Sequence, residues 1–325
     1  MTGSAFSFTD PPCWQVAAPR GVERGDPVKT IRPASPWTRF LRWSGLAGDQ
    51  PSHAQLHNRR LTAMLTRPLQ DTRAIAVISA KGGVGTTSTT VNLGHVFAGF
   101  RRVPVIALDA DPHGANLAYR IPRQTRSTIR DLLRDLHDGV ESVNVRDYTC
   151  QAPSGLEVLA SPPDPELARM IGLDDHSRVI ELLRGRYELV LADCATVVPH
   201  NAGPTVAAAA DQLVIASHPT IDATRATSLM LARLGAQGHG QLVNDAVLVL
   251  NAVGPRVGAV DLAKIERHFA PQVRQIVRVP WDPHLQAGAR ARLEDLRPDT
   301  RRAYLVLASA VAGGFPRAAR TQGHV

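Results

Sequence analysis

From residue 74 onward, short runs of apolar residues alternate with longer stretches in which apolar residues recur at helical spacing. Continuous apolar runs of this length are typical of parallel strands that are buried on both faces. The alternation predicts an α/β fold, in which a mostly parallel sheet carries helices on both faces. The expected strands cover residues 74–79, 103–108, 155–160, 187–192, 211–217, 244–251 and 275–279.

Three stretches show the clearest helical spacing. The first covers residues 87–99 and directly follows a glycine-rich segment, and an alanine- and leucine-rich stretch covers residues 298–312. The third lies earlier, over residues 52–67, where Leu61 and Leu65 are four residues apart and therefore share one helical face. These helices are long enough to cover a sheet of the predicted size.

The pattern divides the chain into four segments. Residues 1–50 contain prolines and glycines at irregular spacing, without sustained periodicity, and are predicted to form a largely disordered arm. Residues 51–73 are expected to form a helix and a linker, residues 74–315 a single α/β domain, and residues 316–325 a short tail.

The net charge of +8 is concentrated near the start of the chain. Residues 1–73 hold ten arginines and lysines against five acidic residues, which leaves +5 in this segment. Such an arm can contact nucleic acid, acidic lipid or an acidic protein, or it can act as a solubilising tail. Trp37, Phe40 and Leu41 fit one face of a short helix, for which docking on a protein surface is favoured over membrane contact.

Composition and the length of the apolar runs indicate where in the cell the protein is expected. No run approaches the roughly 18 apolar residues of a membrane span, and the first 30 residues lack the layout of a signal peptide. Cys13, Cys150 and Cys194 are widely spaced and form no CxxC pair, which argues against a disulfide framework or a cysteine metal site. The expected location is the cytoplasm, with a peripheral position at the inner face of the membrane as an alternative.

The strongest chemical signal is the segment 80–88, Ala-Lys-Gly-Gly-Val-Gly-Thr-Thr-Ser, which lies between a predicted strand and a predicted helix. Glycines let the backbone curl so that successive N–H groups point at a polyphosphate, and the helix adds its unpaired N-terminal amides. Thr87 stands where a hydroxyl can reach Mg²⁺. The sequence therefore predicts a site for ATP and Mg²⁺ rather than a glycine-rich turn that binds nothing.

The loop resembles the deviant P-loop of the MinD/ParA ATPases, whose pattern is K-G-G-x-G-K-[ST]. The resemblance extends over residues 74–312. It implies that Lys81 reaches across a dimer interface to the partner's nucleotide, so that ATP joins two copies and hydrolysis releases them. The nucleotide-binding residues that it implies in the loop are Gly82, Gly83, Val84, Gly85, Thr86, Thr87 and Ser88.

One position departs from the family pattern, because Thr86 stands in place of the second lysine. That lysine holds the β- and γ-phosphates, and its charge matters most in the transition state. Its loss is expected to remove roughly 2–4 kcal/mol of transition-state stabilisation. Nucleotide binding is therefore expected to persist, while hydrolysis is slow or absent.

Two acidic segments follow predicted strands. Asp109 and Asp111 belong to an Asp-Ala-Asp-Pro segment that resembles the family's DxDP motif, although such a pair can also serve as a cap or a turn. The resemblance assigns Asp111 to the attacking water and Asp109 to the water shell of the metal. Asp193 ends a strand that resembles Walker B and is expected to hold Mg²⁺ through water.

Two further segments resemble the adenine-binding parts of the family. Asn251 ends a predicted strand and carries an amide that offers the base both a donor and an acceptor. Pro280 and Asp282 belong to a later Val-Pro-Trp-Asp loop that flanks the adenine in the family. Both segments also occur as ordinary strand ends and turns, so they are less specific than the P-loop.

The order of arm, helix and core is similar to the MinD-like ATPases of actinobacterial type VII secretion systems, as are residues 210–215, 279–285 and 300–305. This resemblance implies a switch that is monomeric without nucleotide, dimerises on ATP and regulates a protein partner in a secretion or localisation complex. An ATP-binding module without hydrolysis is the main alternative. A DNA-partitioning ParA-type ATPase is less favoured, because much of the excess positive charge lies in the arm.

Overall fold

The computed structural model describes residues 53–111, 116–139, 143–196, 209–252, 254 and 261–315. The expectations for the arm (1–50), for its tryptophan-containing segment and for the tail (316–325) lie outside the described residues. In the part of the chain that the structure describes, every helix is too short or too polar to cross a membrane.

The described residues form one sheet of eight strands in the order β3-β4-β2-β5-β1-β6-β7-β8. All neighbouring strands are parallel except β3 and β4, which are antiparallel. The sequence therefore predicted the mostly parallel α/β sheet correctly, but it did not predict the short edge strand β3. The strands are β1 (Arg73–Ser79), β2 (Val105–Asp109), β3 (Thr149–Gln151), β4 (Leu156–Leu159), β5 (Leu189–Thr196), β6 (Gln212–Ser217), β7 (Val247–Asn251) and β8 (Gln275–Val279).

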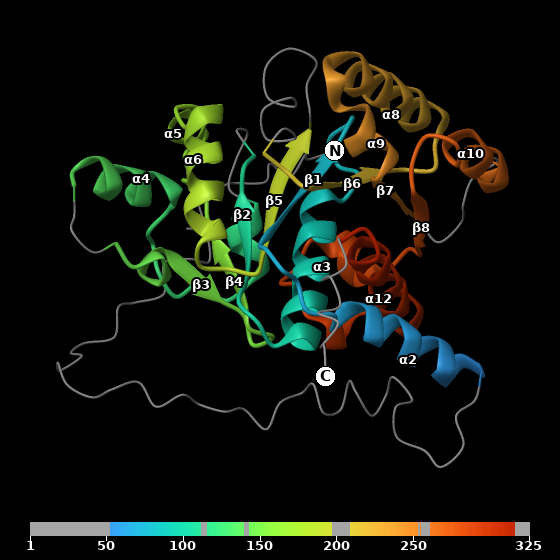
Figure 1. Cartoon of the computed structure of the whole chain (residues 1–325), viewed down its shortest axis with the longest axis horizontal. Coiled ribbons are helices and arrows are strands. Elements are labelled where there is room, and N and C mark those ends of the chain that lie inside the picture. The colour runs from blue at the N-terminus through green and yellow to red at the C-terminus, as the bar shows by residue number, and fades with distance from the viewer. Residues whose placement is uncertain are drawn as a thin grey trace, which may run out of the picture. The chain divides into compact units, whose positions relative to one another are not determined.

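Helices cover both faces of this sheet (Figure 1). One face packs against α2, α3 and α12, and the other packs against α4, α6, α8, α9 and α10. The helices are α2 (His53–Leu65), α3 (Thr86–Arg101), α4 (Ile129–His137), α5 (Pro165–Arg169), α6 (Leu173–Arg184), α8 (Ile221–Leu234), α9 (Gly240–Asn244), α10 (Leu262–Phe269), α11 (Pro283–Ala287) and α12 (Pro298–Ala312).

Alternation along the strands produces two separate cores. In β1, Ile75 and Val77 belong to the core under α2, α3 and α12, whereas Ala76 and Ile78 belong to the core on the opposite face. Side chains on a strand point alternately to the two faces of a sheet, and here both faces are covered. This explains why β1 has a nearly continuous apolar sequence.

The helix α2 belongs to the same body as the sheet. Leu61 and Leu65 are buried in the core that α3 and α12 share, and the hydroxyl of Ser309 on α12 donates to the carbonyl of Leu61 (3.1 Å). A guanidinium nitrogen of Arg101, at the end of α3, donates to the carbonyl of Leu65 (2.6 Å). Helix α2 is therefore fixed to two other helices by apolar and polar contacts.

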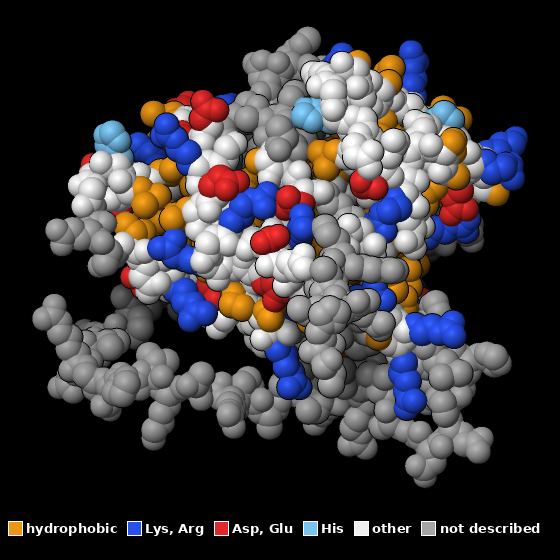
Figure 2. All heavy atoms as spheres, in the orientation of Figure 1, with side chains coloured by type: hydrophobic (Ala, Val, Ile, Leu, Met, Phe, Trp, Pro, Cys, Tyr) orange, Lys and Arg blue, Asp and Glu red, His pale blue; other side chains and the backbone are white. Residues whose placement is uncertain are grey.

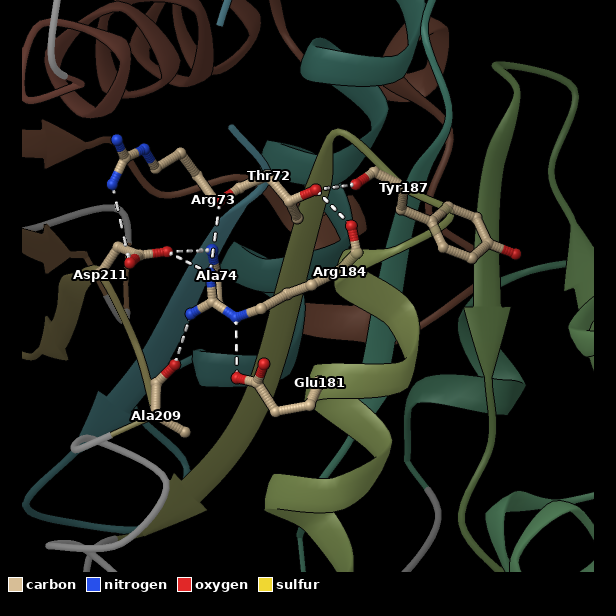
Figure 3. Close-up of polar contacts among 8 residues, drawn as sticks. All are labelled: Thr72, Arg73, Ala74, Glu181, Arg184, Tyr187, Ala209 and Asp211. Atoms are coloured by element: carbon tan, nitrogen blue, oxygen red, sulfur yellow. Dashed lines mark hydrogen bonds and ion pairs between the residues drawn. The ribbon is translucent and has the colours of Figure 1, made fainter. Parts of the chain in front are cut away.

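A charged network ties elements together where β1 and β6 begin (Figure 3). The carboxylate of Asp211 accepts from the backbone amide of Ala74 (2.7 Å) and from Arg184 (2.9 Å), while Arg73 lies 3.6 Å away. Arg184 also donates to the carbonyl of Ala209 (2.8 Å). These contacts join α6, β1 and the entry to β6 at the edge of the sheet opposite the carboxyl ends of the parallel strands.

Candidate functional site

The glycine-rich loop connects the carboxyl end of β1 to the start of α3. Gly83 and Gly85 have positive φ angles of 77° and 86°, a conformation that side chains with a Cβ rarely adopt. Gly85 is also the N-cap residue of α3 and provides no side chain to cap the helix. The first amides of α3 are therefore left for another acceptor, and a helix N-terminus of this kind attracts anions.

Helix α3 begins at Thr86, one residue before the predicted start. The Thr86 side chain is buried, and Thr87 and Ser88 are half-buried. Thr86 therefore occupies the first turn of the helix, where a lysine would stand in the family pattern. Thr87 and Ser88 are among the residues that line the adjacent pocket.

A pocket of about 580 Å³ opens beside this loop. Its walls come from the P-loop, from the segments that follow β2, β6, β7 and β8, and from α12. Most of these segments lie at the carboxyl ends of parallel strands, where open α/β sheets bind ligands. The predicted residues that line it are Gly82, Gly83, Val84, Gly85, Thr86, Thr87, Ser88, Asp111, Asn251, Pro280 and Asp282.

Three predicted acidic residues lie near the same edge of the sheet. Asp109 and Asp193 are register partners on β2 and β5, and both are fully buried. Asp111 lines the pocket, and its amide lies 3.3 Å from the Asp109 carboxylate. Strand β5 continues to Thr196, so Asp193 lies inside the strand rather than at its end as predicted.

The buried position of Asp109 beside Asp193 affects the pKa of its carboxyl group. Burial raises the pKa of the Asp109 carboxyl well above its usual range, and the negative charge of Asp193 raises it further. The amides of Leu117 and Asp111 donate to this carboxylate and act in the opposite direction. A cation at this edge would stabilise both carboxylates in their charged form.

The donor set suits a magnesium ion that arrives with a nucleotide. Among the described residues, no group of three or more histidines, cysteines, aspartates or glutamates is arranged to bind a metal by itself. Mg²⁺ keeps several water ligands and commonly binds through one or two protein oxygens together with phosphates. The Thr87 hydroxyl and the Asp193 and Asp109 carboxylates, acting through water, fit that requirement.

Asn251 holds the P-loop from the end of β7. Its side-chain nitrogen donates to the carbonyl of Val84 (2.8 Å) and to the hydroxyl of Thr89 (3.3 Å). A Cβ placed on Gly85 would lie 3.0 Å from this nitrogen, so the loop and the amide are closely packed. The adenine contact of Asn251 remains a prediction, and the structure adds a positioning contact that the sequence did not suggest.

His218, directly after β6, is a lining residue that sequence reasoning did not find. One ring nitrogen lies 2.9 Å from the carbonyl of Asn251, and the other lies 3.1 Å from the carbonyl of Gly83. The histidine therefore links the P-loop to the end of β7. No motif marks it, because its partner Gly83 is 135 positions away in the sequence.

The Val-Pro-Trp-Asp segment forms another wall of the pocket. Asp282 is buried, and its carboxylate accepts from the backbone amides of His284 (2.9 Å) and Arg297 (2.8 Å). Trp281 is half-buried, with the Arg297 guanidinium 5.2 Å from its ring centroid. Asp282 therefore organises the loop around Pro280, and Trp281 supplies an aromatic surface that the sequence reasoning had not assigned.

Lys81 behaves differently from the rest of the loop. Its side chain is exposed, and it does not line the pocket of its own chain. Its backbone carbonyl accepts from the hydroxyl of Ser79 (3.0 Å). The lysine therefore starts from a fixed backbone position but does not reach the pocket that its own loop forms.

Similarity to known proteins agrees with this geometry. A family model described as the CobQ/CobB/MinD/ParA nucleotide binding domain matches residues 75–293, which include the P-loop, the acidic residues and the Val-Pro-Trp-Asp segment. The chain belongs to this family. The match agrees with the MinD/ParA resemblance that the loop predicted.

The chain is also similar to individual proteins and solved structures. The ESX-1 secretion-associated protein EspI of Mycobacterium tuberculosis is 32% identical over 278 residues, which cover 85% of this chain and 41% of EspI. The chain thus spans about two fifths of the length of that relative. Among solved structures, the cell division ATPase MinD of Pyrococcus furiosus has a TM-score of 0.59 at 23% identity, with 74% of this chain and 98% of that chain covered.

The fold is also similar to that of MinD from Pyrococcus horikoshii, which was solved in complex with Mg-ADP. The TM-score is 0.59 at 22% identity, and the match covers 73% of this chain and 94% of that one. At this identity the similarity shows the fold alone.

Proposed function

We propose that the protein is an ATP-dependent switch that binds Mg-ATP in the pocket beside the P-loop, dimerises on ATP and regulates a partner complex. The observation that carries the proposal is the pocket itself. It is lined by the glycine-rich loop, by the start of α3, which has no side-chain cap, and by Asp111, while the buried carboxylates of Asp109 and Asp193 lie at the same edge of the sheet without lining it. This combination suits a polyphosphate with a divalent cation.

The predicted loop, acidic and base-flanking residues each have a role in this proposal. The amides of the P-loop and of the first turn of α3 bind the phosphates, and Thr87 binds Mg²⁺ with Asp193 and Asp109 acting through water. Asp111 lines the pocket and orients the attacking water, while Asn251 and the loop at Pro280 flank the base. When bound, Mg²⁺ neutralises charge on the phosphate oxygens.

Hydrolysis is proposed to be slow, because Thr86 supplies no charge to the phosphates. A binding module that holds ATP without hydrolysing it is the second candidate, and the same residue favours it. The position of Thr86 adds support, since a short, uncharged side chain stands in the first turn of α3 where the family pattern has a lysine.

A type VII secretion apparatus is the proposed partner complex. The support comes from the 32% identity with EspI, a protein described as ESX-1 secretion-associated. DNA partitioning is less well supported. In the middle of the face shown in Figure 2, Lys and Arg side chains lie among Asp and Glu side chains rather than in one basic patch.

The proposal is tested by measuring Mg-ATP binding and turnover for the wild type and Thr86→Lys side by side. Binding by both with turnover only in the lysine variant would establish a binding switch without hydrolysis. Equal turnover would show that the wild type is a working ATPase in which Thr86 is compensated. If neither protein binds Mg-ATP, the proposed function is wrong.

A further inference from the structure

Arg120 lines the pocket, and hydrogen bonds at both ends of its short helix fix its backbone. It ends η1 (Leu117–Arg120), a short 3-10 helix between β2 and α4. The start of η1 is tied to the site because the amide of Leu117 donates to the Asp109 carboxylate (3.1 Å). Its end is tied to the loop after α11 because the amide of Ala291 donates to the carbonyl of Arg120 (2.7 Å). The backbone of Arg120 is therefore fixed relative to the acidic edge of the site.

The side chain of Arg120 lines the same pocket as the P-loop and Asp111. Among the lining residues, all of which lie in the described part of the chain, it is the only arginine or lysine. Burial lowers the pKa of its guanidinium, while the negative charge of Asp193 raises it. An arginine keeps its charge at neutral pH even when it is half-buried, so the pocket contains a permanent cation close to its acidic edge.

Few of the Arg120 donors are used by the part of the protein that the structure describes. Within the described residues, its one side-chain hydrogen bond is a long contact from Nη1 to the carbonyl of Ala289 (3.4 Å), and no carboxylate forms an ion pair with it. A guanidinium carries five N–H donors. Two other half-buried arginines behave differently, since Arg184 pairs with Asp211 at 2.9 Å and Arg101 pairs with Glu188.

Gly288 leaves space for the Arg120 guanidinium. Gly288, also a lining residue, has a φ angle of 63°, and a Cβ on it would lie 3.2 Å from Nη1 of Arg120. A Cβ at this position would require the guanidinium to shift by a few tenths of an ångström. The pocket is thus lined both by an arginine that makes one long side-chain hydrogen bond within the described residues and by a P-loop that has Thr86 where the family pattern has a lysine.

We infer that Arg120 binds the terminal phosphates of the nucleotide and supplies the positive charge that Thr86 does not. A guanidinium can form two parallel hydrogen bonds to phosphate oxygens, which a single ammonium cannot do. The arginine comes from the segment after β2 rather than from the loop, so the charge would be supplied by a different element that lines the same pocket. This inference rests on the proposed function, because it requires that the pocket binds a nucleoside triphosphate.

The test is equilibrium binding of Mg-ATP and of AMP, measured by calorimetry on the nucleotide-free full chain. The variants are Arg120→Gln, Thr86→Lys, the double variant, and Arg130→Gln as a control. Arg130 is exposed on α4 and does not line the pocket. Arg120→Gln is expected to weaken Mg-ATP binding by roughly 10- to 100-fold, the usual effect of losing hydrogen bonds to a charged group.

AMP lacks the terminal phosphates, so its affinity should change by far less. Thr86→Lys is expected to raise the affinity for ATP at least tenfold in the Arg120→Gln background and by clearly less in the wild type, because the lysine then supplies a charge that Arg120 otherwise supplies. A purely structural role of Arg120 would give equal gains in both backgrounds. Arg130→Gln should bind both ligands like the wild type. Melting curves without nucleotide check that each variant folds.

The inference is overturned if Arg120→Gln binds Mg-ATP like the wild type, if it loses ATP and AMP equally, or if Thr86→Lys restores nothing or gives equal gains in both backgrounds. In those cases the wild type still binds ATP and the proposed function stands. Absence of binding to the wild type and to Thr86→Lys would instead remove the proposed function itself.

Discussion

Asp109 and Asp193 face each other across β2 and β5, and both are fully buried. The pKa of Asp109 is raised by burial and by Asp193. An unfolded aspartate titrates near 3.9, so above that pH the folded protein binds more protons than the unfolded chain. The contribution of Asp109 to the free energy of unfolding is therefore largest below the unfolded pKa, and it decreases as the pH rises toward the folded pKa.

Removal of the Asp193 charge should stabilise the nucleotide-free protein at neutral pH. Asp193→Asn takes away one cause of the raised pKa, and the expected gain in unfolding free energy is on the order of 1 kcal/mol. Its melting temperature should also fall less than that of the wild type between pH 5 and pH 8, measured in EDTA without nucleotide. Magnesium-dependent ATP binding should weaken in the same variant.

Asp211→Asn is the matched control for Asp193→Asn. The Asp211 carboxylate accepts from the Ala74 amide and from Arg184 at the opposite edge of the sheet. Loss of these charge-assisted bonds should cost about 1–3 kcal/mol and lower the melting temperature. If both variants melt below the wild type, repulsion between Asp109 and Asp193 does not limit stability.

The start of α3 depends on Gly85, where φ is 86°. Gly85→Ala should cost about 1–2 kcal/mol for the left-handed conformation. It should cost more because the new Cβ lies 3.0 Å from the Asn251 nitrogen that holds Val84. The free energy of unfolding, measured by chemical denaturation, and the affinity for Mg-ATP are both expected to decrease in Gly85→Ala.

Gly155→Ala separates the cost of the left-handed conformation from the cost of the close contact with Asn251. Gly155 has a φ angle of 92°, and a Cβ there would meet no atom within 4 Å. This variant should show the conformational cost without a change in nucleotide affinity. Equal losses of stability and affinity in both variants would mean that the contact between Asn251 and the loop is unimportant.

Helix α2 is predicted to be part of the folded body. Leu65 is fully buried in the core shared by α3 and α12, so Leu65→Ala should lower the unfolding free energy by about 2–5 kcal/mol. The exposed Thr66→Ala, one residue further on, should change it by less than about 0.5 kcal/mol. Urea unfolding measures both, and a small loss for Leu65→Ala would indicate that α2 is only a linker.

The elements that sequence reasoning found are those whose signal is local. The buried parallel strands are apolar runs, and the P-loop residues are contiguous, so spacing alone located them. Strand β3 is only three residues long, with the exposed Gln151 at its end, so it carries too little apolar pattern to be recognised. The strand β5 was predicted too short, because the charged Asp193 lies inside it.

The site was only partly predictable for a different reason. Asp109, Asp111 and Asp193 follow or end apolar strands, and parallel strands bring their carboxyl ends together. Arg120 and His218 line the pocket because the fold brings η1 and the segment after β6 to it from distant parts of the sequence. The sequence around them has no spacing that reveals this, so these two residues required the structure.

At the scale of the whole molecule, the exposed Lys81 is the residue that should couple two copies. It does not line the pocket of its own chain, so the proposed sandwich dimer requires it to reach the nucleotide of the partner. Lys81→Ala should therefore bind Mg-ATP as a monomer, whereas the wild type should be a monomer without nucleotide and a dimer with Mg-ATP. Sedimentation velocity with and without Mg-ATP measures the assembly.

Lys264→Ala is the matched control, because Lys264 is an exposed lysine on α10 outside the pocket. It should dimerise with ATP like the wild type, since loss of one surface charge alone has little effect on a specific interface. A parallel binding measurement shows whether Lys81→Ala still holds ATP, which separates loss of assembly from loss of ligand. If Lys81→Ala dimerises normally with Mg-ATP, the lysine does not bridge two copies and the dimer must form through another surface.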